Sequence, residues 1–260
     1  MRFLGFFLLP LVALAEVPIE HSAELSRIFQ EQNARGTFVL LEAKTGKLIA
    51  HDPERAAKRF IPASTFKIPN TLIGLEAGAV KSVDEVLPYG GKPQPFPTWE
   101  HDMPLREAIR LSAVPIYQEL ARRIGLAKMK ESVARLEYGN HRIGTIVDRF
   151  WLDGPLEISA IEQTQFLARL LLGRLPYRPE NVAAVKEITV LEKLGEYEVH
   201  GKTGWCTSSN PDIGWWVGWL EKNGELTASF ALNIDVLDEK ADIAKRVPIG
   251  RACLQALGYK

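Results

Sequence analysis

The sequence predicts an α+β fold, α/β in content, with two lobes. A central antiparallel sheet is built from both chain ends and has flanking helices, and the second lobe is inserted and mainly helical. Two observations predict it. Apolar residues recur at helical spacing through most of residues 62–175, whereas runs rich in valine, isoleucine and aromatic residues fill residues 36–51 and 197–235. The cleft between two such lobes is a natural ligand site.

The first 15 residues, MRFLGFFLLPLVALA, have the layout of a secretory signal peptide. A positive charge at Arg2 precedes a short apolar run, and the run ends in the A-x-A sequence Ala13-Leu14-Ala15. The run is too short to span a bilayer comfortably. We therefore predict cleavage after Ala15 and export to the periplasm without membrane attachment; an uncleaved anchor is the alternative.

The strand-rich lobe is predicted over residues 16–60 and 187–260. Its first part contains an amphipathic helix, followed by a hairpin that turns at Lys44-Thr45-Gly46. Its second part contains three strands and a closing helix, and Asn223-Gly224 supplies the turn between the last two strands. In chain order, the predicted segments are the helix 21–34, the hairpin 36–52, the strands 197–205, 213–221 and 226–235, and the helix 241–258.

The helical lobe is predicted over residues 61–186. Its first helix ends at Gly78, which is a plausible C-cap residue. Its last helix opens at Ser159, with Glu162 three residues later as a capping box. The Pro/Gly-rich residues 87–99 are predicted to form a surface loop. The predicted helical segments are 64–78, 104–125, with Ser112 at the end of a helix, 125–139 and 159–176.

Composition excludes several classes of function. The formal net charge is zero, so no basic field indicates a nucleic-acid partner. The sequence has no C-x-x-C and no H-E-x-x-H, and we predict no metal site. The two cysteines, Cys206 and Cys253, are predicted to be free thiols, with a disulfide as the alternative. The chain is predicted to be a monomer or a homodimer.

Ser64 and Lys67 are the first candidate catalytic pair. A serine is a weak nucleophile until a neighbouring base activates it, and residues three apart on a helix face the same way. Pro62 suits the start of that helix, whose unpaired backbone N–H groups can stabilise an oxyanion. The chain has no G-x-S-x-G nucleophile elbow, which removes the main support for an α/β-hydrolase.

Two further motifs follow Ser64-Thr65-Phe66-Lys67 in order. Ser112-Ala113-Val114 ends a predicted helix, and Lys202-Thr203-Gly204 lies on a predicted strand before Trp205. The order S-x-x-K, S-x-V, K-T-G is that of the penicillin-recognising serine enzymes. Because three ordered motifs each fall in the expected local structure, they are far more specific than S-x-x-K alone.

With these motifs the chain resembles the class D, oxacillinase-type, serine β-lactamases, over nearly all of its length after the signal peptide. Tyr138-Gly139-Asn140, Trp151 within RFWL and Arg246 in the closing helix also match that class. The class A pattern is not followed, because Val114 stands where class A has asparagine. The resemblance implies a β-lactamase/transpeptidase-like fold for residues 16–260 and hydrolysis of penicillin-type antibiotics, giving β-lactam resistance.

The resemblance also implies an N-carboxylated Lys67 (N6-carboxylysine) as general base for acylation and deacylation. Carbon dioxide or bicarbonate would carboxylate it, and no other cofactor is expected. Phe66, Val114 and Trp151 would keep the lysine dry, and desolvation lowers an amine's pKa. The implied catalytic residues are Ser64, Lys67, Ser112 and Trp151. The implied substrate-binding residues are Val114, Lys202, Thr203, Gly204, Trp205 and Arg246.

The resemblance also implies what each of these residues contacts. The backbone N–H groups of Ser64 and Trp205 would hold the oxyanion. Ser112 would relay a proton to the ring nitrogen, helped by Lys202. Trp151 would donate its indole N–H to the carbamate. Lys202, Thr203 and Arg246 would receive the substrate carboxylate.

Several alternatives remain open. Trp151 is otherwise a core residue, and Arg246 a surface residue. Tyr138-Gly139-Asn140 is interpreted as a mainly structural turn, Trp215, Trp216 and Trp219 as sheet packing, and His200 is given no catalytic part. The same motifs serve penicillin-binding D,D-peptidases and non-hydrolysing β-lactam sensor domains, which are the rival functions.

Overall fold

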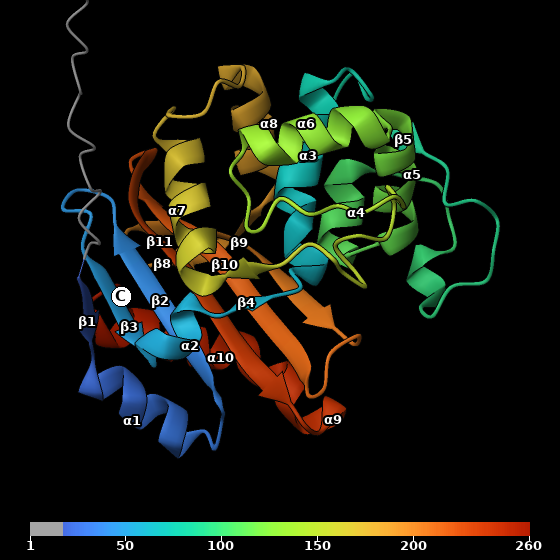
Figure 1. Ribbon diagram of the computed structural model, residues 1–260. Helices are drawn as coiled ribbons and strands as arrows, with labels where there is room; N and C mark the ends of the chain where they lie inside the picture. Colours follow the sequence, from blue (N-terminus) through green and yellow to red (C-terminus); the bar gives the residue numbers. More distant parts are fainter. Residues whose placement is uncertain (1–17) are drawn as a thin grey trace, which may run out of the picture.

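The computed structural model describes residues 18–260, and the predicted signal peptide lies outside them. A seven-stranded sheet forms the centre of the molecule, in the order β1-β3-β2-β11-β10-β9-β8 (Figure 1). Its strands are β1 (Ile19–His21), β2 (Gly36–Glu42), β3 (Leu48–His51), β8 (Val190–Leu194), β9 (Tyr197–Cys206), β10 (Asp212–Lys222) and β11 (Glu225–Val236).

The two ends of the chain meet in this sheet as predicted. β2, from the N-terminal part, pairs antiparallel with β11, and Leu40 lies opposite Phe230. The expected all-antiparallel sheet is wrong at one pair, since β1 runs parallel to β3 and Ile19 lies opposite Leu48. β1 has three residues, two of them exposed, and so offers no apolar pattern from which to predict it.

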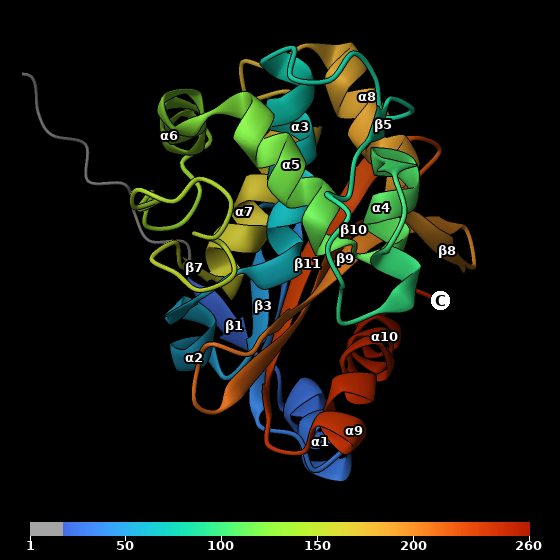
Figure 2. The ribbon, with the colours of Figure 1, turned by 90° about the vertical axis from the view of Figure 1, so that its right-hand side faces the viewer.

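The sheet is covered on both faces (Figure 2). α1 (Ala23–Glu31) and α10 (Arg246–Ala256) contact each other and cover one face, where Trp216 is buried. The helical lobe covers the other face, where Trp215 and Trp219 are buried. The three tryptophans therefore follow the alternation of β10, and the prediction that they pack the sheet is confirmed.

The helical lobe begins with a 3₁₀ turn, η1 (Ala63–Phe66), that leads directly into α3. The predicted helical stretch 104–125 is two helices that break at Ser112 and Ala113. The predicted capping box of Ser159 and Glu162 is present at the start of α7. The helices are α2 (Pro53–Ala57), α3 (Lys67–Glu76), α4 (Leu105–Leu111), α5 (Val114–Ile124), α6 (Leu126–Arg135), α7 (Ala160–Leu171) and α8 (Pro179–Ile188).

The remaining elements are short. After β11, α9 (Glu239–Asp242) and η3 (Ile243–Lys245) lead into α10. Two small two-stranded sheets brace the helical lobe. They are formed by β4 (Arg59–Phe60) with β7 (Ile158–Ser159), and by β5 (Val86–Leu87) with β6 (Met103–Pro104); the surface loop between β5 and β6 carries η2 (Pro97–Trp99).

Both cysteines are buried free thiols, as predicted. Cys206 is the last residue of β9, and Cys253 lies in α10. Within residues 18–260, no helix combines the length and the apolar character needed to cross a membrane.

Candidate active site

Ser64 and Lys67 are in direct contact. Ser64 lies in η1 and Lys67 is the first residue of α3, and the lysine Nζ donates to the serine Oγ over 2.8 Å. Side chains three residues apart eclipse each other in a 3₁₀ turn, which accounts for this close approach. Ala63, just before the serine, has a φ of +47°, a left-handed conformation that is uncommon without glycine. The backbone is thus held in an unusual shape where the nucleophile is expected.

Lys67 is fully buried, with 0% of its surface exposed. The neighbouring residue Phe66 stacks on Trp151 with ring centroids 5.5 Å apart, and the Nζ of Lys67 lies 5.2 Å from the centre of the Tyr117 ring. Burial lowers the pKa of Lys67 well below its ordinary value of 10.5, and the charge of Lys202 lowers it further. The dry surroundings predicted for this lysine are therefore present, and they favour the neutral amine.

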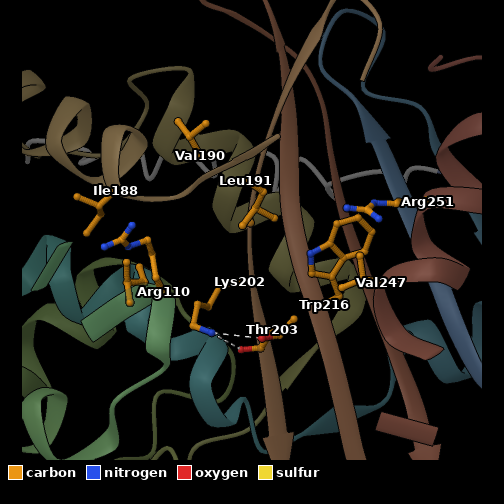
Figure 3. Close-up of a pocket in the computed structure, with 11 residues that line it drawn as sticks. Arg110, Ile188, Val190, Leu191, Lys202, Thr203, Trp216, Val247 and Arg251 are labelled. Carbon is orange, nitrogen blue, oxygen red and sulfur yellow. Dashed lines mark hydrogen bonds between the residues drawn. The ribbon is translucent and has the colours of Figure 1, made fainter. Parts of the chain in front are cut away.

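The K-T-G residues lie on β9, which contacts η1, the turn that carries Ser64. Lys202 is 6% exposed, and its Nζ donates to the carbonyl oxygen of Thr203 over 3.1 Å and to its hydroxyl over 3.3 Å (Figure 3). Burial lowers the pKa of Lys202 to about 7, and the nearby charge of Arg246 contributes. A substrate carboxylate would restore the charged form of this amine.

Gly204 lets β9 approach the serine turn closely. A Cβ at this position would lie 3.0 Å from the carbonyl oxygen of Pro62 and 3.1 Å from Cγ2 of Thr65. The N–H of Gly201 donates to Thr189 over 3.0 Å, and β8 pairs with β9 only up to His200. Beyond Gly201, no other strand among the described residues pairs with that edge of β9. The strand therefore presents a free edge beside Ser64.

Arg246 lies against the same strand. Its Nη1 donates to the carbonyl oxygen of Gly204 over 2.6 Å, and its Nε donates to that of Ile243 over 2.7 Å. Its Nη2 makes no hydrogen bond within residues 18–260, so part of the guanidinium remains for a ligand. Burial lowers the pKa of Arg246 to about 10, which still leaves it charged at neutral pH. The predicted carboxylate-binding set, Lys202, Thr203 and Arg246, is thus gathered around one strand.

Trp151 is fully buried, and its indole N–H has no hydrogen-bond partner in the described part of the chain. An unpaired buried donor costs about 1–3 kcal/mol. Because its ring stacks on Phe66, Trp151 packs in the core, as the alternative interpretation of this residue proposed. Its indole N–H is also a hydrogen-bond donor without an acceptor. Both functions are compatible with this position.

Ser112 and Val114 lie at the junction between α4 and α5. Ser112 ends α4 with a φ of +58°, and Val114 is the half-buried first residue of α5. No hydrogen bond joins the Ser112 side chain to another residue in the 18–260 range. The predicted proton relay through Ser112 therefore stays a prediction.

Asn140 holds the Tyr138-Gly139-Asn140 turn together. Its amide donates to Pro155 over 2.9 Å, and its side-chain oxygen accepts from the N–H groups of Arg142 and Glu157. Gly139 has a φ of +59°, and a Cβ there would lie 2.0 Å from a carbonyl oxygen. These contacts favour the structural interpretation of the motif.

Tyr117 was not among the predicted site residues. Its Oη is 2.9 Å from the Thr71 hydroxyl, which also donates to the carbonyl oxygen of Lys67 over 2.8 Å. This pair fixes the tyrosine ring over Nζ. A signal was present in the sequence, because Tyr117 follows Val114 by three residues and so shares its face of α5.

His200 takes no part in this arrangement. His200 stacks on Trp219 at 4.7 Å and hydrogen-bonds to the carbonyl oxygen of Lys186. Among the described residues, no cluster of three or more histidine, cysteine or acidic side chains could hold a metal ion.

A serine–lysine pair under a K-T-G strand, in this two-lobed fold, defines a penicillin-recognising serine enzyme. The family model for the penicillin-binding protein transpeptidase domain matches residues 36–255. The predicted β-lactamase/transpeptidase-like α+β fold is confirmed by this match and by the structural neighbours.

Similar proteins identify which kind of penicillin-recognising serine enzyme this chain is. The chain is 42% identical to β-lactamase OXA-10 of Pseudomonas aeruginosa over 88% of each chain. It is 40% identical to β-lactamase OXA-48 of Klebsiella pneumoniae, over 80% of this chain and 78% of that one. The class D β-lactamase FUS-1 (OXA-85) of Fusobacterium nucleatum subsp. polymorphum superposes with a TM-score of 0.88 at 43% identity, over 92% of this chain and 99% of that one. The chain belongs to the class D β-lactamases, and the resemblance inferred from its motifs is confirmed.

Proposed function

We propose that this protein hydrolyses the β-lactam amide bond of penicillin-type antibiotics through an acyl-enzyme on Ser64, and so confers β-lactam resistance. The proposal is carried by one observation: a fully buried Lys67 whose Nζ is 2.8 Å from Ser64 Oγ. A lysine in this position can act as a base only when it is unprotonated, and its lowered pKa favours that state. We also propose export to the periplasm, where the antibiotics act.

The surroundings of Lys67 fit N-carboxylation. A neutral amine can add carbon dioxide with loss of one proton, and the resulting carbamate would supply the general base for acylation and deacylation. Lys67 has no exposed surface, and its amine lies 5.2 Å from the centre of the Tyr117 ring, so water is excluded from it. The unpartnered indole N–H of Trp151 would give an added anion its hydrogen-bond donor.

In acylation, Ser64 Oγ would give its proton to the base at Lys67 and bond to the lactam carbonyl carbon, and the carbonyl electron pair would move onto oxygen. The backbone N–H groups of Ser64 and Trp205 would hold that oxyanion. Collapse of the intermediate breaks the ring C–N bond, and Ser112 would pass a proton to the departing nitrogen, helped by Lys202. Attack by water on the ester then releases the product and restores Ser64.

The substrate carboxylate would bind to Lys202, Thr203 and Arg246. Two cations and a hydroxyl suit an anion, and the hydrogen bonds would be charge-assisted. Val114 would keep the lysine side of the cleft apolar, while Gly204 and Trp205 line the edge of β9 along which the substrate lies. No metal is proposed in this chemistry.

A turnover assay tests the proposed function. The purified protein is mixed with a chromogenic cephalosporin in excess, and product is counted per enzyme molecule. Many equivalents are expected from wild type and none from Ser64→Ala. About one equivalent per wild-type molecule would contradict hydrolysis and favour a D,D-peptidase or a sensor domain.

A further inference from the structure

Two histidines and a serine of the strand-rich lobe meet at one point, far along the sheet from the K-T-G strand. His21 is the last residue of β1, His51 is the last residue of β3, and Ser26 lies in α1. β1 and β3 pair in parallel, and Ser22 alone separates β1 from α1 (Figure 1). The parallel pairing therefore brings the two histidines to the same end of neighbouring strands.

The two imidazole rings converge on the Ser26 hydroxyl. Its Oγ is 2.9 Å from Nδ1 of His51 and 3.1 Å from Nε2 of His21. The hydroxyl donates its single proton to the carbonyl oxygen of Ser22 over 3.0 Å, so it has none to give to either ring. In the tautomers that leave these two nitrogens unprotonated, both lone pairs point at one place without a donor. Such a pair of nitrogens is open to a cation.

The His51 ring is held in a conformation that suits a metal ligand. It is half-buried and stacks on Phe29 with ring centroids 4.2 Å apart. Burial lowers the pKa of His51 below its ordinary value of 6.5, and an imidazole must be unprotonated to bind a metal. His21 is exposed, so its ring is free to turn. Since Zn²⁺ binds imidazole nitrogen at about 2.0–2.1 Å, a small turn of His21 suffices to close the distance.

The charges near His51 allow a cation. The carboxylate of Asp52, the next residue, attracts positive charge to the ring, whereas Arg55 and His21 oppose it. Arg55 is paired with Asp235 over 2.7 Å, and this ion pair offsets much of its repulsion. The repulsion from His21 disappears when both rings are neutral, which is the state that binds a metal.

We propose that His21 and His51 form a binding site for one divalent transition-metal ion, Zn²⁺ or Cu²⁺. Water completes the coordination, because no cluster of three or more ligating side chains occurs within residues 18–260. The bound ion fastens the end of β1 to the end of β3 and so stabilises this edge of the sheet. The prediction of no metal site considered local motifs, and this pair forms only through the pairing of β1 with β3.

This site is separate from the proposed chemistry. β2, β11 and β10 lie between β3 and the K-T-G strand in the sheet. The ion therefore takes no part in hydrolysis, and the inference does not depend on the proposed function.

Calorimetric titration of the protein, purified without a histidine tag, tests the site with ZnCl₂, CuCl₂ and MgCl₂. One Zn²⁺ or one Cu²⁺ should bind per chain, and Cu²⁺ should bind more tightly, in the usual order for nitrogen ligands. Mg²⁺ should not bind, because it prefers oxygen ligands. At a Zn²⁺ concentration about 100 times Kd, the Tm should rise by about 5 °C.

Three variants locate the ligands, and a fourth is the control. His21→Gln and His51→Gln should each raise the Kd for Zn²⁺ at least about tenfold. Ser26→Ala removes the shared hydroxyl and keeps both rings, so it should still bind the ion. His101→Gln removes an exposed histidine that lies next to a carboxylate elsewhere, and it should leave Kd unchanged.

Electron paramagnetic resonance of bound Cu²⁺ counts the imidazoles. Nitrogen couplings from two rings are expected in wild type, and from one ring in each single histidine variant. Failure of both Zn²⁺ and Cu²⁺ to bind would overturn the proposal, and so would a Kd that is the same in wild type and His21→Gln. His21 is exposed, so this variant is expected to fold and decides the matter even if His51→Gln, which loses the stack on Phe29, does not fold.

Discussion

The amine of Lys67 donates a 2.8 Å hydrogen bond to the hydroxyl of Ser64, although the lysine has no exposed surface. The 3₁₀ turn brings the two side chains together, and the amine lies 5.2 Å from the centre of the Tyr117 ring. Burial makes the ammonium form unfavourable, so the fold prepares a neutral nitrogen next to the nucleophile.

Ser64→Ala should abolish covalent labelling by penicillin and reduce turnover at least about a thousandfold. The reason is that no other hydroxyl is hydrogen-bonded to Lys67 Nζ among the described residues. Intact-protein mass spectrometry after penicillin treatment makes the measurement. An adduct that persists on the variant would identify a different nucleophile.

The pH profile of kcat/KM should be bell-shaped. On the acid side, protonation of Lys67 removes the base, and this limb lies far below 10.5 because the pKa is lowered. On the alkaline side, Lys202 loses its proton above about 7, and substrate carboxylate binding weakens as pH rises. Steady-state rates between pH 5 and pH 9 make the measurement, and a flat profile above neutral pH would contradict the assignment of Lys202.

Lys202→Arg is the matched control for the alkaline limb. Arginine stays charged throughout this range, so the limb near 7 should disappear even if the rate falls at every pH. A limb that remains at the same pH in this variant belongs to another group.

Arg246→Ala should raise KM about tenfold and lower kcat much less. A carboxylate anchor contributes similar binding to the ground state and the transition state, and a charge-assisted hydrogen bond has about this magnitude. Saturation kinetics with a penicillin make the measurement. A fall in kcat at an unchanged KM would instead indicate that Arg246 acts mainly through its bond to the carbonyl oxygen of Gly204.

Asn140→Ala should lower the free energy of unfolding by about 2 kcal/mol, because three hydrogen bonds are lost, one of them partly buried. The kcat of the folded variant should stay close to that of wild type. Urea denaturation measures the first quantity. Arg142→Ala, whose side chain is exposed, is the control and should change neither.

The elements predicted correctly are those whose apolar pattern is local and long. The paired strands β10 and β11 and the capped helix α7 are examples. β1 and β8 were not predicted because they are short and mostly exposed, and α8 was not predicted either. β1 and β3 are separated in the sequence by α1 and β2. No local sequence pattern therefore predicts their parallel pairing.

The site was predictable to the extent that its motifs are local. Ser64 and Lys67 are joined by a single turn, and Lys202 to Thr203 by a single strand, so their proximity follows from spacing. The unpartnered indole N–H of Trp151 and the Tyr117 ring over Lys67 arise from tertiary packing between separate helices and loops. No local sequence pattern predicts these contacts.

The proposed catalysis depends on a carbamate on the buried Lys67. Carbon-13 NMR of the protein in degassed buffer, titrated with labelled bicarbonate, detects this group. We expect a carbamate resonance that grows together with turnover, is lost on acidification as Lys67 is protonated, and is absent in Lys67→Ala. Trp151→Phe, which removes the indole donor, should need more bicarbonate for half-maximal rate. If wild type shows no resonance, and neither protein's turnover responds to bicarbonate, the claim is contradicted and the free amine of Lys67 is the base.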